Sequence, residues 1–179
     1  MQRYYTGVGA RLTPSDIQDL MKKIGNFLGL QGYVLRSGGS PGADMAFEMG
    51  CGSYPKEIYL PFKNFQNNPS PHYLTDEKFE EITKHDVWKF VSDSLKKEEP
   101  SVNMKALPNE TQRLYARDVL QIFGKDLNSP SEKVICWTPD NEKEGTRITL
   151  YIAKFAGVPV ENLSDKSTFQ QWSDKVKGI

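Results

Sequence analysis

The feature that most constrains how this chain folds is a glycine-rich stretch between a short apolar run and a helical pattern. The apolar run is Tyr33-Val34-Leu35, and the glycine-rich stretch is Ser37-Gly38-Gly39-Ser40-Pro41-Gly42. The helical pattern covers residues 43–49 and ends at Gly50. Glycine permits positive φ and a close approach of the backbone to a neighbour or a ligand. We therefore expect a strand, a tight turn and a helix in this order.

The same order recurs on either side of this unit. Tyr4-Tyr5-Thr6 runs into Gly7-Val8-Gly9, and a helix then starts with Thr13 as N-cap and Pro14 at its first position. Its apolar stripe at helical spacing consists of Ile17, Leu20, Met21, Ile24 and Leu28. Later in the chain, residues 133–137 (KVICW) predict a strand, and a helix that opens at Gly145-Thr146-Arg147 is closed by Gly157.

Two more strands and several helices complete the pattern. The strands are expected at residues 56–60 and 158–160, and the helices within residues 75–97, over about 109–123 and near the C-terminus. Strands that alternate with helices through short turns pair in parallel. We predict an α/β fold, a Rossmann-like three-layer sandwich with a mostly parallel sheet of about five strands and helices on both faces. Residues 1–179 are expected to form a single domain, with residues 61–132 as a largely helical insertion.

The composition excludes several classes of protein. Lys plus Arg and Asp plus Glu both total 23, so a nucleic-acid partner would need a local basic patch. Cys51 and Cys136 lie far apart without metal-ligand spacing, which favours a reducing cytosol over a disulfide scaffold. We find no signal-peptide pattern and no apolar run long enough to span a bilayer. We expect a soluble, cytoplasmic protein without a membrane partner.

The three glycine-bearing turns are expected to meet at one edge of the sheet. In an open parallel sheet, the carboxyl ends of the strands face the amino ends of the following helices, and ligands bind there. Helix amino termini offer free N–H groups and a partial positive charge, which suit a phosphate. The alternative, that the glycines only make tight turns, remains open for each turn taken alone.

These motifs resemble a known superfamily. Residues 5–11 (YTGVGAR), residues 37–44 (SGGSPGAD), Gly145-Thr146-Arg147 and residues 157–160 (GVPV) are similar to the SLOG superfamily. That superfamily has Rossmann-like domains and includes the DNA-processing protein DprA, the LOG phosphoribohydrolases and stand-alone nucleotide-binding proteins. The resemblance covers roughly residues 3–60 and 133–163.

The resemblance implies a ligand site built from all three turns. Residues from the first turn would line one side, residues from the second would form the floor, and the third turn would close the far side. The chain departs from the LOG pattern around residues 144–150, which lack its double glycine and its glutamate. The expected ligand-binding residues are Thr6, Gly7, Gly9, Arg11, Ser37, Gly38, Gly39, Ser40, Gly42, Asp44, Gly145, Thr146 and Arg147.

Individual residues allow two interpretations. Asp44 lies in the first turn of its helix, where the helix dipole stabilises a carboxylate, so a structural role stands beside a ligand-binding one. Arg11, Arg36 and Arg147 adjoin glycine turns, and each either binds phosphate with its planar fork or is a solvated surface residue. Both histidines fall in the insertion without a second metal ligand. The catalytic residues are unknown.

Three functions remain. The leading hypothesis is the binding of a phosphate-bearing nucleotide or nucleotide-derived signalling ligand without strong catalysis. The second is a DprA-like single-stranded DNA-binding module, which the resemblance implies. The third is a LOG-like hydrolase acting on a nucleotide N-glycosidic bond, with Asp44, Asp140 or Glu144 as the carboxylate. We expect no cofactor and no metal, and we expect a homo-oligomer.

Overall fold

The protein is built on one five-stranded parallel sheet with the strand order β3-β2-β1-β4-β5. The computed structural model describes residues 1–139 and 146–179. The strands are β1 (Arg3–Gly9), β2 (Tyr33–Ser37), β3 (Lys56–Ile58), β4 (Val134–Trp137) and β5 (Val160–Asn162). Every pairing between neighbouring strands is parallel. The predicted α/β fold with a sheet of about five strands is confirmed.

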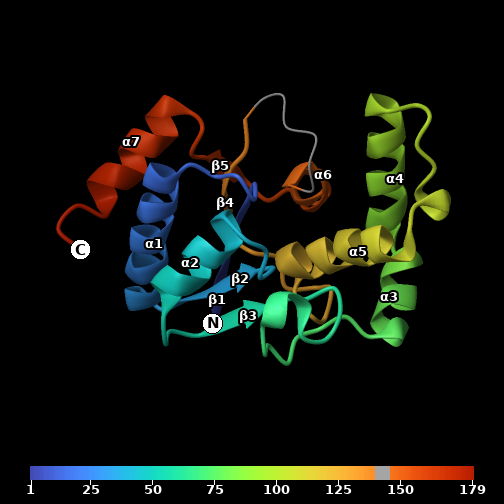
Figure 1. Ribbon diagram of the computed structural model, residues 1–179, viewed down its shortest axis with the longest axis horizontal. Coiled ribbons are helices and arrows are strands. Elements are labelled where there is room, and N and C mark those ends of the chain that lie inside the picture. Colours follow the sequence, from blue (N-terminus) through green and yellow to red (C-terminus); the bar gives the residue numbers. More distant parts are fainter. Residues whose placement is uncertain (140–145) are drawn as a thin grey trace.

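Helices cover both faces of the sheet and make three layers (Figure 1). One apolar core lies between the sheet and α1, α2 and α7, and a second lies between the sheet and α3 to α6. The helices are α1 (Ser15–Leu30), α2 (Ala43–Cys51), α3 (Asp76–Thr83), α4 (Asp86–Glu98), α5 (Asn109–Phe123), α6 (Thr146–Ala156) and α7 (Lys166–Lys175). Short 3-10 helices occur at Phe65–Asn67 and Met104–Ala106.

The central strand β1 is buried on both faces because its side chains alternate between the two cores. Tyr5 packs in the core on the side of α1 and α2, whereas Val8 packs in the core on the side of α5 and α6. Thr6 points to the α5 side, where its hydroxyl lies 2.6 Å from the carbonyl oxygen of Gln121. The carboxyl end of β1 is therefore held between both helical layers.

Two predicted helix patterns agree closely with the structure. The apolar stripe of the first helix is buried along α1, and the helix predicted over residues 109–123 is α5. Residues 75–97 form two helices, α3 and α4, and the second begins after His85. The Nδ1 atom of His85 accepts a hydrogen bond of 3.1 Å from the backbone N–H of Val87, so this histidine caps α4.

Three local predictions were wrong. Residues 7–9 belong to β1 and do not form a turn, because β4 continues the parallel pairing as far as Gly9. Pro14 and not Thr13 is the N-cap of α1, since the Thr13 hydroxyl donates to the carbonyl oxygen of Ala10. The last strand lies two residues later than expected, because the N–H of Val158 still closes the end of α6 through the carbonyl oxygen of Ala153.

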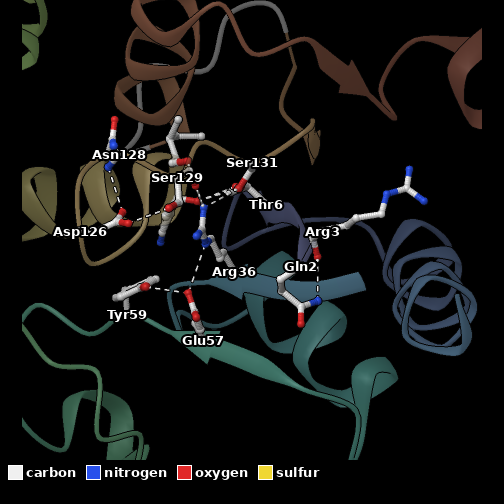
Figure 2. A network of polar contacts seen from close by, with 12 residues as sticks. Gln2, Arg3, Thr6, Arg36, Glu57, Tyr59, Asp126, Asn128, Ser129 and Ser131 are labelled. Atoms are coloured by element: carbon white, nitrogen blue, oxygen red, sulfur yellow. Dashed lines mark hydrogen bonds and ion pairs between the residues drawn. The ribbon is translucent and has the colours of Figure 1, made fainter. Parts of the chain in front are cut away.

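Arg36 on β2 is buried in a network that ties the connection between α5 and β4 to the sheet (Figure 2). Its Nε donates 3.2 Å to Glu57, and its Nη1 donates to the carbonyl oxygens of Ser129 (2.5 Å) and Ile122 (3.3 Å). The guanidinium also lies 3.7 Å from the ring centre of Tyr4. Arg36 is thus neither a solvated surface residue nor a residue of the sheet edge where a ligand would bind.

Candidate functional site

A cavity of about 610 Å³ opens at the carboxyl end of β1. Residues of α2, α5 and α6 form its other walls. Because the strand order reverses direction between β1 and β4, this is the topological switch point of the sheet, where ligands of open α/β folds bind. The volume lies within the range of about 300–1,000 Å³ that is usual for small-molecule sites.

The structure brings five of the predicted ligand-binding residues to this cavity. Gly9 and Arg11 follow the end of β1, Ser40 comes from the turn before α2, Asp44 from the first turn of α2, and Thr146 begins α6. They meet because the carboxyl ends of parallel strands all lie at one edge of the sheet. The helices that follow these strands begin at the same edge. Five of the predicted residues therefore share one cavity, and their role in binding a ligand stays a prediction.

Several other predicted residues do not line the cavity. The hydroxyl of Thr6 is buried against Gln121 and Ser131, and the hydroxyl of Ser37 donates 2.6 Å to the carbonyl oxygen of Gly7. Gly7 itself lies under the ring of Phe47. These residues join β1 to its neighbours. Gly145, with Asp140 and Glu144, lies outside the described residues.

Arg147, which was expected to close the far side of the site, points toward α4. Its Nη2 donates 3.1 Å to Glu99, and its Nη1 forms an ion pair of 3.5 Å with Glu98. It is not among the residues that line the cavity. Both acids lie at the end of α4, so Arg147 holds the end of that helix against α6.

The glycines of the second turn shape the protein around the cavity. Gly42 has φ +86°, and a side chain there would meet the carbonyl oxygen of Ala10 at 2.6 Å. Gly38 lies under α5, where a Cβ atom would meet Nη1 of Arg117 at 2.6 Å. Gly39 faces Leu60 and Asn68. None of the three lines the cavity, although the turn they form carries Ser40 into it.

Asp44 already occupies hydrogen-bond donors that a phosphate would use. The backbone N–H of Ser40 donates 3.3 Å to its carboxylate, and the backbone of Gly9 also contributes a hydrogen bond. Burial raises the pKa of Asp44 to about 6, against the opposing effects of Arg117 and these hydrogen bonds. The turn before α2 therefore holds an internal carboxyl group at the position predicted for a phosphate.

Helix α5 supplies a second set of cavity residues that sequence reasoning did not place there. Arg117 donates 3.0 Å from Nε to Asp118, and its Nη1 donates to the carbonyl oxygens of Gly38 (2.5 Å) and Tyr59 (3.0 Å). Burial raises the pKa of Asp118 to about 7; Arg117 lowers it, and the nearby Asp44 raises it. Two carboxyl groups with raised pKa values and one arginine thus share the inner wall.

Gln121 completes this inner wall one helical turn after Arg117. It is 1% exposed and lines the cavity, and its Oε1 atom has no hydrogen-bond partner among the residues that the structure describes. A buried polar atom without a partner is uncommon and costs stability. The signal in the sequence was the three polar residues at positions 117, 118 and 121, which lie among buried apolar residues of α5.

None of the cysteines and histidines, all of which the structure describes, lines the cavity. Cys136 is fully buried in β4, and burial raises the pKa of its thiol to about 12. Within the described part of the chain, no three His, Cys, Asp or Glu residues gather as metal ligands would. The side chains that line the cavity therefore offer carboxyl, guanidinium, amide and hydroxyl groups.

No helix among the described residues has the length and apolar character needed to cross a membrane.

Comparison with known proteins shows the fold. No protein-family model matches the chain, and no curated protein matches it. The chain is similar to the solved structure of DNA processing protein A from Helicobacter pylori, described for its single-stranded DNA binding mode. The TM-score is 0.55 at 15% sequence identity, and the match covers 90% of this chain. It spans 64% of that protein's chain, which has the same Rossmann-like α/β architecture.

Proposed function

We propose that the protein binds a phosphate-bearing nucleotide or nucleotide-derived ligand in the cavity at the carboxyl end of β1. The observation that carries this proposal is the cavity itself, which combines nucleotide-compatible volume with a cationic rim and a polar inner wall. The proposal assigns the phosphate to the rim and the rest of the nucleotide to the interior.

Arg11 and the amino end of α6 support the phosphate end of this assignment. Arg11 is exposed at the rim, and among the described residues it forms no ion pair that would hold it elsewhere. Thr146, the first residue of α6, lines the same cavity, and a helix amino terminus attracts an anion. The turn before α2 is less suited to binding a phosphate, because the backbone N–H of Ser40 already donates to the carboxylate of Asp44.

Isothermal titration calorimetry with nucleoside 5′-monophosphates tests the proposal. Wild-type protein should bind at least one monophosphate, and the corresponding nucleoside should bind more weakly. Arg11→Ala should weaken the binding of the monophosphate about tenfold or more, since a charge-assisted hydrogen bond contributes about 1.5–3 kcal/mol. The nucleoside should be affected less.

Arg3→Ala is the matched control. Arg3 is also a partly exposed arginine of the β1 unit, but it lies at the opposite end of the strand and pairs with Glu132. Its removal should leave nucleotide affinity unchanged. If no mono-, di- or cyclic nucleotide binds to the wild-type protein, or if both variants lose affinity equally, the rim is not a phosphate site.

Single-stranded DNA binding is a second candidate. The fold similarity to DNA processing protein A favours it, and so does the exposed pair Arg11 and Leu12 at the cavity rim. Arg11 suits a backbone phosphate, and the exposed Leu12 offers an apolar surface against which a base can pack. Membership of the SLOG superfamily, proposed on the glycine motifs, fits either candidate.

A mobility-shift titration with oligonucleotides separates the two candidates. Binding of DNA through phosphate contacts should weaken steeply between low and moderate salt, because counterions are released. The net charge of zero predicts a weak complex even at low salt. An oligonucleotide that competes with a bound mononucleotide would place both ligands at the same rim.

A further inference from the structure

The inner wall of the cavity is rich in hydrogen-bond acceptors. The carboxyl groups of Asp44 and Asp118 and the Oε1 atom of Gln121 all belong to cavity-lining residues that are less than a tenth exposed. Arg117 donates one hydrogen bond to the carboxyl group of Asp118, and the backbone N–H of Ser40 donates one to that of Asp44. The Oε1 atom of Gln121 is satisfied by no described residue. A ligand that reaches the Oε1 atom of Gln121 or the ionised carboxylates must therefore donate hydrogen bonds.

We propose that this acceptor wall, defined as Asp44, Asp118 and Gln121, binds the amino-bearing edge of a nucleobase. The inference rests on the proposed nucleotide binding and names the part of the ligand that the interior selects. The amino groups of adenine, guanine and cytosine donate to carboxylate and carboxamide oxygens in just this way.

A phosphate does not suit the acceptor wall. The carboxyl groups of Asp44 and Asp118 repel an anion where they are ionised. Arg117, which lies beside them, already donates to Asp118 and to the carbonyl oxygens of Gly38 and Tyr59. The rim, by contrast, holds the exposed Arg11. The charges of the cavity therefore orient a nucleotide with its phosphate outward and its base inward.

The walls beside these acceptors suit a planar base better than a sugar. Leu114 and Tyr115 of α5 and Val8 of β1 line the same cavity. Apolar and aromatic side chains provide surfaces on which a planar ring packs, while nearby amide and carboxyl groups read its edge. The ribose of a nucleotide is a small, non-planar ring with hydroxyl groups at C2′ and C3′, and it would leave much of this apolar surface unused.

Pairs of ligands that differ at the amino group test the inference. The pairs are AMP with purine riboside 5′-monophosphate, GMP with IMP, and CMP with UMP, each titrated by calorimetry. In at least one pair, the amino-bearing ligand should bind tenfold or more tightly, because its analogue leaves a buried acceptor unpaired. The 2′-deoxy form of the preferred ligand should bind within about threefold of the ribose form.

Gln121→Met removes the unpaired acceptor at nearly constant volume. This variant should lose most of the preference within the discriminating pair, and its thermal midpoint should be unchanged or higher, because a buried unsatisfied atom is gone. Gln112→Met is the control on the same helix. Gln112 donates to the carbonyl oxygen of Leu107 and does not line the cavity, so its replacement should leave the preference intact.

The outcomes separate this inference from the function on which it rests. Equal affinity within all three pairs, or a preference that follows the 2′-hydroxyl, overturns the assignment of the base to the acceptor wall while nucleotide binding stands. Retention of the full preference by Gln121→Met also overturns it, and so does an equal loss of preference in Gln121→Met and Gln112→Met. The absence of binding by all six monophosphates overturns the proposed function and this inference together.

Discussion

The guanidinium of Arg117 donates a hydrogen bond of 2.5 Å to the carbonyl oxygen of Gly38, and so joins α5 to the glycine-rich turn that follows β2. The two residues are 79 positions apart in the sequence. Arg117 also pairs with the buried Asp118, and both line the cavity. The segment of residues 61–132, predicted as an insertion, thus contributes a wall of the candidate site.

Arg117→Met should destabilise the protein by about 3 kcal/mol, because it leaves the Asp118 carboxyl buried without its partner. Urea denaturation measures this change. In the double variant Arg117→Met/Asp118→Leu, no unpaired charge remains, and at least about 1 kcal/mol of stability should return. Equal stability of the single and double variants would show that the ion pair is not the cause.

Gly38→Ala tests the close approach of α5 to the turn. The added methyl group would meet Nη1 of Arg117 and the side-chain amide of Gln121, so the variant should lose about 1–3 kcal/mol of stability. Adding Gln121→Ala should make room and recover part of the loss, which a double-mutant cycle detects as a coupling energy. Strict additivity would mean that the two residues do not collide.

Local patterns in the sequence predicted which helices and strands form, but they did not predict where all of them begin and end. The helical pattern over about residues 109–123 predicted the bounds of α5, because burial follows the helical period along one segment. The glycines at residues 7–9 predicted a turn, but β4 supplies a pairing partner for that backbone from far along the chain. Strand pairing is a long-range property, and no local rule detects it.

The residues of the candidate site were predictable only where they follow the carboxyl end of a parallel strand, because ligands of such sheets bind at that edge. Gly9, Ser40 and Asp44 were found because the connection of parallel strands fixes their position. Asp118 and Gln121 reach the cavity only because the long crossover from β3 to β4 lays α5 across the sheet. The sequence around them shows a polar run on a helix, which is equally typical of a solvated face.

Arg36→Lys should destabilise the protein by about 2–3 kcal/mol without changing nucleotide affinity. A lysine has a single ammonium group and cannot reproduce the fork that reaches Glu57, Ile122 and Ser129 at once. Chemical denaturation and calorimetry on the same sample measure both quantities. A fall in affinity at unchanged stability would instead support the phosphate-binding role that the sequence suggested for Arg36.

Arg3→Lys is the control for Arg36→Lys. The ion pair of Arg3 with Glu132 is about half exposed, with side-chain accessibilities of 54% and 42%. Exposed pairs contribute about 0–1 kcal/mol, so this variant should change stability by less than about 1 kcal/mol. If Arg3→Lys lost as much stability as Arg36→Lys, the burial of an arginine would not determine how much it contributes to the stability of this protein.

Asp44→Asn should stabilise the protein at pH 8 and have little effect below about pH 4. Burial raises the pKa of Asp44 from 3.8 to about 6, so the folded state binds more protons than the unfolded state between these values. Stability from this group is therefore fully present below about pH 3.8, is lost progressively between the two pKa values, and is gone above about pH 6. Asparagine keeps an acceptor for the N–H of Ser40 and removes the buried charge.

The measurement for Asp44→Asn is the unfolding free energy by urea titration from about pH 3.5 to pH 8. The variant should gain about 1–2 kcal/mol at pH 8, and its pH profile should be flatter than that of the wild type. Asp118, whose pKa is also raised, keeps part of the slope in both proteins. Asp19→Asn, at an exposed carboxylate on α1, should leave the profile unchanged. A loss of stability at pH 8 in Asp44→Asn would mean that the ionised carboxylate stabilises the turn and that burial is not its dominant effect.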